Sequence, residues 1–258
     1  MKIKIGVISD IHANADALML VMEGLKLKEV DKVVCLGDIL TYGCQPLEVI
    51  DILHEYKKEN SIIFVKGNHD QFYFDLQRGN NKFSYKLPEF VEESVNWTLK
   101  KINSFSLESA FPWLENYYIG NTYFSHANPF RYGNWSYLEE DKDLTKALKS
   151  LEDKNFFSGV FGHSHRQLFV ARNGDDVYEI SEYTSEDNKI DQLIINTGSV
   201  GQPRGKGVGY VILEIKDGEL FKADFHKLKV NFDNSLDLIS GANFKQETSE
   251  KLINYLQR

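Results

Sequence analysis

Short apolar runs alternate with longer segments in which apolar residues recur every three or four positions. The runs at 3–8, 32–38 and 61–68 predict buried strands, and the segments at 14–28 and 46–59 predict amphipathic helices. The second helix is predicted to begin with a proline, a residue that is common in the first turn of helices. The order strand, helix, strand, helix, strand predicts neighbouring parallel strands joined by right-handed crossovers.

The pattern changes at residues 71–116, where helical periodicity combines with many aromatic side chains. We interpret this segment as a helical, cap-like insertion; aromatic residues at helical spacing are also common in ordinary cores, so its contact with a ligand stays open. Further strands are predicted at 118–125, 159–162, 167–172, 193–196, 210–216 and 220–228. Asp217-Gly218 is a hairpin signal between the last two, 173–191 is an exposed loop or hairpin, and a helix begins at Thr248. No repeat or linker interrupts the chain, so we expect one domain over 1–258.

Charge and cysteine content narrow the function classes. A formal net charge of −8 argues against long nucleic acid as a partner, because such proteins usually present a basic face. No run approaches the roughly 18 apolar residues of a membrane span, and the N-terminus lacks the apolar stretch of a secretory signal. Cys35 and Cys44 are too far apart for a redox motif and are expected to be plain thiols. We therefore expect a cytoplasmic protein without a membrane partner.

Polar side chains of one chemical kind gather where strands are predicted to end. The segments are Asp10-Ile11-His12, Gly37-Asp38, Gly67-Asn68-His69-Asp70, Ser125-His126-Ala127-Asn128 and Gly162-His163-Ser164-His165. The carboxyl ends of parallel strands share one edge of a sheet, so these loops can converge. Asp10 and His12 are two residues apart, and in extended backbone that spacing points both side chains the same way. Each segment alone has an ordinary structural explanation, but five of the seven histidines fall within them.

In this order the segments resemble the motif series of the calcineurin-like metallophosphoesterase superfamily: D-x-H, G-D, G-N-H-D, H and G-H-x-H. The segment NTGSVGQPR at 196–204 is similar to the NPGSVGQPR segment of the small prokaryotic branch, with Thr197 in place of proline. The resemblance spans about residues 3–215. It implies an α/β fold, a four-layer α-β-β-α sandwich with two mixed β-sheets.

The resemblance also implies two adjacent sites for divalent transition metal ions. Asp10, His12, Asp38 and His165 would hold one ion, and Asp38, Asn68, His126 and His163 would hold the second, with Asp38 as the bridge. The family favours Mn or Fe, and the mixed nitrogen and oxygen donors also suit Zn or Ni. Such a pair, about 3.5–4 Å apart, activates a water molecule for direct attack on phosphorus.

His69 resembles the family histidine that is not a ligand. We expect it to stabilise developing charge or to protonate the leaving alkoxide, without a phosphoenzyme. Arg204 is expected either to contact a substrate phosphate or only to pack. Asn14 is expected either to support substrate binding or only to cap a helix. The other two histidines, His54 and His226, are expected to be structural or exposed.

The predicted function is phosphodiesterase or nucleotide phosphohydrolase activity on a small phosphorylated molecule, such as one resembling diadenosine tetraphosphate. Phosphomonoesterase and protein phosphatase activities are the alternatives. Thr41 and Tyr42 stand where protein phosphatases of the superfamily carry an Asp-Arg pair, and Lys66 replaces a second arginine, which makes phosphoproteins the weaker alternative. A non-catalytic scaffold, as in the retromer subunit of this fold, is a third hypothesis. That subunit lacks the histidine of the GNH segment, which this chain keeps as His69.

Overall fold

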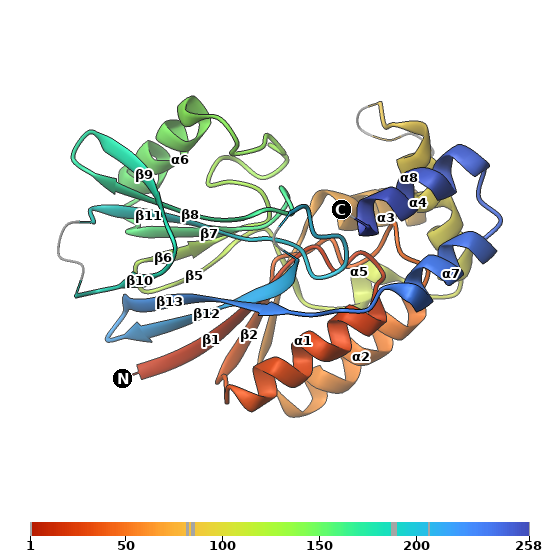
Figure 1. Ribbon diagram of the computed structural model, residues 1–258, viewed down its shortest axis with the longest axis horizontal. Helices are drawn as coiled ribbons and strands as arrows, with labels where there is room; N and C mark the ends of the chain where they lie inside the picture. Colours follow the sequence, from red (N-terminus) through yellow and green to blue (C-terminus); the bar gives the residue numbers. More distant parts are fainter. Residues whose placement is uncertain (1, 81–82, 84–85, 187–189, 206, 258) are drawn as a thin grey trace.

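Two mixed β-sheets pack face to face between outer layers of helices (Figure 1). This computed structural model describes residues 2–80, 83, 86–186, 190–205 and 207–257. The first sheet has the order β10 (Tyr183–Thr184), β13 (Glu219–Leu228), β12 (Val208–Lys216), β1 (Lys2–Ile8), β2 (Lys32–Cys35), β3 (Ile62–Val65), β4 (Trp113–Leu114). The second has the order β5 (Tyr117–Ile119), β6 (Thr122–Phe124), β7 (Ser158–Phe161), β11 (Gln192–Thr197), β8 (Gln167–Asn173), β9 (Asp176–Ile180).

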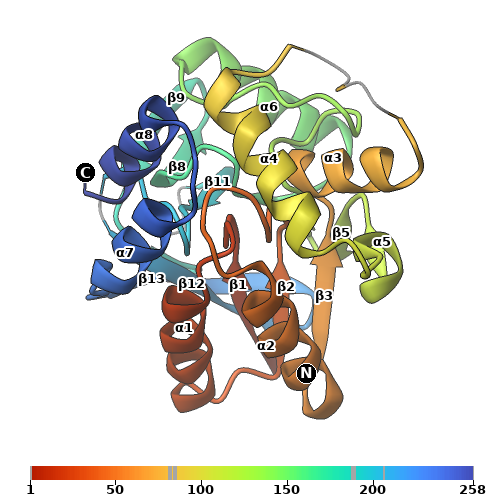
Figure 2. The ribbon, with the colours of Figure 1, turned by 90° about the vertical axis from the view of Figure 1, so that its right-hand side faces the viewer.

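The helices form the outer layers and one end of the molecule. They are α1 (Ala15–Leu27), α2 (Pro46–Glu59), α3 (Asn68–Gln77), α4 (Glu89–Lys101), α5 (Leu107–Ala110), α6 (Asp141–Asp153), α7 (Asp233–Gly241) and α8 (Gln246–Leu256). Helices α1 and α2 cover the first sheet and α6 covers the second, which confirms the four-layer sandwich (Figure 1). Helices α3, α4, α7 and α8 gather at one end of the sheets (Figures 1 and 2).

Three apolar layers hold the sandwich together. Between the sheets, Ile5 and Val7 of β1 pack with Phe124 and Ile195 from the opposite sheet, all fully buried. Ile8 points to the other face, into the layer shared with α1 and α2. Burying each such side chain stabilises the fold by about 1.5–3 kcal/mol. Strands β1, β2 and β3 are buried on both faces, which explains why they appear in the sequence as continuous apolar runs.

The predicted parallel arrangement of the first three strands is confirmed, since β1 pairs with β2 and β2 with β3 in parallel. In the second sheet β6, β7 and β11 are also parallel neighbours. Six strands, three from each sheet, therefore end at the same region of the molecule. The predicted hairpin of β12 and β13 is also confirmed, and Asp217 and Gly218 take φ values of 52° and 88°, as its tight turn requires.

Several elements differ from the sequence prediction. Helices α6 and α7 were not predicted, although Leu144, Ala147, Leu148 and Leu151 of α6 are buried at helical spacing. The predicted strand at 118–125 is a hairpin of β5 and β6, with Gly120 at its turn (φ 56°). The segment 71–116 carries α4 and α5 but ends in β4, an edge strand paired with β3.

The polar segment at 173–191 and the C-terminal helix agree more closely with the sequence prediction. Residues 173–191 contain the short strands β9 and β10, while 187–189 lie outside the described residues. Helix α8 begins two residues before the predicted Thr248. Among the helices of the described residues, none is both long and apolar enough to cross a membrane.

Candidate metal centre

The five polar segments meet where the six parallel strands end. Asp10, Asp38 and Asn68 follow β1, β2 and β3 of the first sheet, while His126 and His163 follow β6 and β7 of the second. The side chains come from strands up to 153 positions apart, yet the backbone N–H of His163 donates to Asp10 Oδ2 at 2.9 Å. Each of the predicted ligand residues is buried, with at most 7% exposure.

Asp10, His12 and His165 form one group with metal-ligand geometry. Asp10 Oδ1 lies 3.3 Å from His165 Nε2 and 3.7 Å from His12 Nε2. The two histidine Nε2 atoms are 3.1 Å apart. Three donor atoms from two loops thus lie within 3.7 Å of one another.

Asp38, His126 and His163 form the second group. His126 Nε2 lies 3.2 Å from Asp38 Oδ2 and 3.1 Å from Asn68 Oδ1, so the amide of Asn68 adjoins the same group. His163 Nε2 is 2.9 Å from the carbonyl oxygen of Trp135, to which it donates, leaving Nδ1 as its free nitrogen. The structure therefore brings together all seven predicted ligand side chains.

The hydrogen bonds around the groups suit bound cations. Nδ1 of His12, His126 and His165 donates to the carbonyl oxygens of Leu40, Leu36 and Gln202 at 3.0, 2.7 and 2.7 Å. With Nδ1 protonated, the Nε2 lone pairs of His12 and His165 face each other at 3.1 Å, which is unfavourable unless a cation lies between them. Asp10 Oδ1 is buried and has no hydrogen-bond partner within the described part of the chain. These residues fit divalent metal ions.

The ionisation of the groups supports the same conclusion. Burial alone would raise the pKa of Asp10, but the adjacent imidazoles of His165 and His12 hold it well below its usual range. Burial lowers the pKa of His163 to about 4, which favours the neutral, ligand form of its imidazole. Burial opposes protonation of His126 as well, yet Asp38 raises its pKa to about 9; a bound cation would displace that proton.

The backbone of the ligand loops is strained. Asp10, His12, Asp38, His163 and His165 all have positive φ, between 47° and 66°, a region that non-glycine residues rarely adopt. The prediction that Asp10 and His12 lie in extended backbone is therefore wrong. Hydrogen bonds from their N–H groups to the carbonyls of Gly37 and Asp38, both 3.0 Å, hold this loop instead. Such strain concentrates at functional sites, where surrounding contacts compensate its cost.

Two glycines are required because the loops approach so closely. A Cβ on Gly67 would lie 2.1 Å from Asp38 Oδ1, and one on Gly162 would lie 1.9 Å from Ser9 Oγ and 2.5 Å from Asp10 Oδ2. Any larger residue would push a ligand carboxylate out of position. The glycines of these segments thus allow the close approach of the loops.

Asp70 positions the second loop, a role that was not predicted from the sequence. Its carboxylate is fully buried and accepts hydrogen bonds from the N–H groups of Gly67, Asp38 and Ile39 at 2.8, 2.8 and 3.1 Å. Burial and the charge of Asp38 raise its pKa to about 6, although the three N–H groups oppose that shift. Its place directly after His69 in the GNHD segment was the available signal.

We expect Asp70→Asn to weaken both the fold and metal binding, because an amide group can accept fewer of the three hydrogen bonds and carries no charge. The loss should be about 1–3 kcal/mol in free energy of unfolding and about 10- to 100-fold in metal affinity. Urea unfolding and calorimetric titration with Mn²⁺ measure the two effects. Asp51→Asn, at an exposed position of α2, is the control. Unchanged stability and affinity in Asp70→Asn would contradict this role.

The segment at 196–204 fastens the Asp10 loop. Ser199 Oγ donates to the carbonyl oxygen of Asp10 at 2.7 Å. The backbone N–H groups of Val200 and Gly201 donate to the carbonyl oxygens of Ser9 and Asp10, respectively. Thr197, which replaces the proline of similar segments, lies at the end of β11. The segment therefore supports the centre without adding a ligand-type side chain to it.

Asn14 and Arg204, the predicted substrate contacts, lie in different settings. The Asn14 side chain accepts from the N–H of Ala17 as the cap of α1 and donates to the carbonyl of Gly201, so its amide serves the structure. Arg204 is only partly buried and lines a cavity beside the metal centre.

This cavity has a volume of about 690 Å³ and includes Asn68, His69 and His163 in its wall. The rest of the lining comes from Tyr42, Phe72, Leu87, Pro88, Phe90, Val91, Trp135, Tyr137, Arg204, Lys251 and Tyr255. His69 Nε2 lies 4.0 Å from Asp38 Oδ2 and 3.3 Å from the hydroxyl of Tyr42. His69 thus faces both the second group and the cavity. The contributions of Trp135, Tyr137 and α8 were missed, because no motif marks them.

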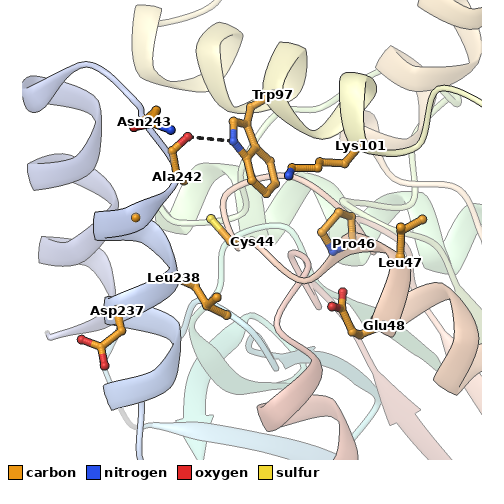
Figure 3. A pocket seen from close by; sticks show the side chains of 11 residues that line it. Cys44, Pro46, Leu47, Glu48, Trp97, Lys101, Asp237, Leu238, Ala242 and Asn243 are labelled. Carbon is orange, nitrogen blue, oxygen red and sulfur yellow. Dashed lines mark hydrogen bonds between the residues drawn. The ribbon is translucent and has the colours of Figure 1, made fainter.

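Another cavity, of about 490 Å³, lies between α2, α4 and α7 (Figure 3). Its wall contains Cys44, Trp97 and Lys101, and Trp97 Nε1 donates to the carbonyl of Ala242 at 2.9 Å. None of the residues that line it belongs to the two metal-binding groups. We therefore place the chemistry in the cavity beside the metal centre.

Solved structures of similar shape agree with this fold. A metallophosphoesterase from Sphaerobacter thermophilus superposes with a TM-score of 0.73 at 22% identity, covering 99% of this chain and 100% of that one. A hypothetical protein from Pyrococcus horikoshii gives 0.75 at 16% identity, covering 96% and 97%.

Comparison of the amino-acid sequence identifies the family of the chain. An uncharacterized protein from Methanocaldococcus jannaschii is 31% identical over 261 residues, covering 98% of both chains. The family model for the calcineurin-like phosphoesterase superfamily domain matches residues 3–218, which contain the whole metal centre. The chain therefore belongs to the calcineurin-like phosphoesterase superfamily and is a metal-dependent phosphoesterase.

Proposed function

We propose that the protein hydrolyses a phosphodiester or nucleotide phosphate bond in a small substrate, with two metal ions held at the centre. Asp10, His12 and His165 bind one ion, and Asn68, His126 and His163 bind the other. The carboxylate of Asp38 would contribute to both sites. The two groups of ligand-type donor atoms, which lie where the parallel strands end, support this assignment.

Bound cations supply Lewis acidity and lower the pKa of a water molecule for attack on phosphorus. The chain's own residues orient the reaction. Asp38 Oδ1 accepts from the N–H of His69 at 2.8 Å, which fixes that residue beside the second group. His69 Nε2 then faces the cavity, where it can stabilise or protonate the departing oxygen.

The cavity beside His69 supports the proposed class of substrate. Its volume of about 690 Å³ lies in the range of ligand-sized sites and far exceeds one phosphate group. Its aromatic side chains suit a nucleotide or another flat leaving group. A phosphomonoesterase is the second candidate, since the metal chemistry is the same. Tyr42 occupies part of the cavity wall where protein phosphatases of the superfamily carry the Asp-Arg pair, which disfavours a phosphoprotein substrate.

Metal identity and location complete the proposal. We favour Mn or Fe, with Zn or Ni as alternatives, because the donor set mixes imidazole nitrogens with carboxylate and amide oxygens. A cytoplasmic location is supported by the two cysteines, both of which are free thiols in the structure.

The experiment is turnover of bis-p-nitrophenyl phosphate, p-nitrophenyl phosphate and diadenosine tetraphosphate by the purified protein with Mn²⁺, with and without a chelator. We expect metal-dependent hydrolysis that favours the diester or the dinucleotide. Faster turnover of the monoester would support the second candidate. Turnover of none of the three with Mn²⁺, Fe²⁺, Zn²⁺ or Ni²⁺ would contradict the proposal.

A further inference from the structure

One part of the cavity wall lies mostly outside the sequence motifs. It consists of Phe90 at the start of α4, Lys251 and Tyr255 of α8, and Arg204, the last residue of the segment at 196–204. Helices α4 and α8 pack against each other, and both lie at the end of the sheets where the metal centre is found (Figure 2). We call these four residues the α8 wall.

The α8 wall adds positive charge to the cavity apart from the metal ligands. Arg204 and Lys251 are cations, and the described residues that line the cavity include no carboxylate. Arg204 has its backbone fixed beside the metal centre, because its backbone N–H donates to the carbonyl of the ligand residue His165 at 3.0 Å. Its Nε is buried and has no hydrogen-bond partner among the described residues. A guanidinium at this position can offer paired donors to a phosphate.

The same wall presents aromatic rings. The centroids of Phe90 and Tyr255 are 6.0 Å apart, and Phe90 stacks on Tyr42 at 6.2 Å with an interplanar angle of 19°. The Arg204 guanidinium lies 5.3 Å from the Tyr255 ring centroid, and Lys251 Nζ lies 5.7 Å from that of Phe90. Cations and rings are therefore interleaved, an arrangement that suits a ligand with both phosphate and nucleobase.

We propose that the α8 wall binds the uncleaved part of the substrate: Arg204 and Lys251 hold a phosphate that is not hydrolysed, and Phe90 and Tyr255 hold a base. This rests on the proposed function and narrows its substrate class to nucleotides with at least one phosphate beyond the scissile one. Bound metal ions would hold the scissile phosphate, so Arg204 and Lys251 would have no further phosphate to contact in a simple ester. The cavity volume of about 690 Å³ leaves room for such a ligand.

The test compares discrimination between substrates in Arg204→Gln, Lys251→Gln and Tyr255→Leu, with Mn²⁺ bound. We expect kcat/KM for diadenosine tetraphosphate, divided by that for bis-p-nitrophenyl phosphate, to fall about tenfold in each variant, mainly through KM. The diester carries a single phosphate and no base, so it reports the metal centre. Lys57→Gln, at an exposed position of α2, is the matched control and should keep the wild-type ratio. Thermal unfolding checks that each variant folds.

A tripolyphosphate competitor separates the two parts of the wall. Its inhibition constant should rise in Arg204→Gln and Lys251→Gln and stay unchanged in Tyr255→Leu, because it offers phosphates without a base. Wild-type ratios in the folded variants would overturn the inference and leave the proposed function intact. So would a wild type that cleaves the diester but neither cleaves diadenosine tetraphosphate nor is inhibited by it. A wild type that hydrolyses no phosphate ester would contradict the proposed function itself.

Discussion

Replacing Asp38 with asparagine is expected to reduce kcat/KM at least about 10³-fold and to lower the bound metal below two ions per chain. Asp38 Oδ2 lies 3.2 Å from His126 Nε2, and the proposed bridge places the same carboxylate against both ions. An amide of the same shape brings no charge to offset two cations, and one of its positions is a donor. The loss should therefore exceed that of any residue that serves one ion.

The measurements are turnover of bis-p-nitrophenyl phosphate and elemental analysis of the purified variant. Asp51→Asn removes an exposed carboxylate from α2 and should retain activity and metal. Circular dichroism establishes that Asp38→Asn still folds. If the variant keeps two ions and wild-type turnover, Asp38 does not bridge.

His69→Ala is expected to lower kcat by about 10²- to 10⁴-fold while both metal ions stay bound. His69 Nε2 lies 4.0 Å from Asp38 Oδ2 and faces the cavity, which is why we assign it to the substrate side of the centre. Retained metal with lost turnover is the result that separates a catalytic residue from a ligand. Elemental analysis and steady-state kinetics measure the two quantities.

A comparison of two leaving groups distinguishes the two possible roles of His69, proton donation and charge stabilisation. If it donates a proton, the loss should be larger for an alkyl leaving group than for p-nitrophenolate, which departs without one. If it only stabilises charge, the two losses should be similar. His226→Ala, in β13 and stacked on Tyr210, is the control. Loss of one metal ion in His69→Ala would instead make it a ligand.

The fold could be predicted largely because its central strands are buried on both faces. That burial produces the apolar runs of β1, β2 and β3, and the helices between these strands are long enough to serve as crossovers for parallel pairing. Helix α7 was missed because only two of its residues, Ser235 and Ile239, are buried, so its sequence carries little periodicity. Helix α6 has a clear stripe of buried apolar residues, but the polar residues around that stripe kept it from being predicted.

The sequence by itself determined which side chains could serve as donors, because the order and spacing of the five polar segments resemble the motif series of the superfamily and metal ions require particular side chains. Asp10, His12 and Asp38 were identifiable for this reason. Only the tertiary structure decided how they are held: the positive φ values of these residues and the three hydrogen bonds of Asp70 arise from contacts between loops. Most of the α8 wall also could not be predicted from the sequence, which indicated only Arg204. Lys251 and Tyr255 are ordinary helix residues, and only the packing of α8 against α4 carries them to the cavity.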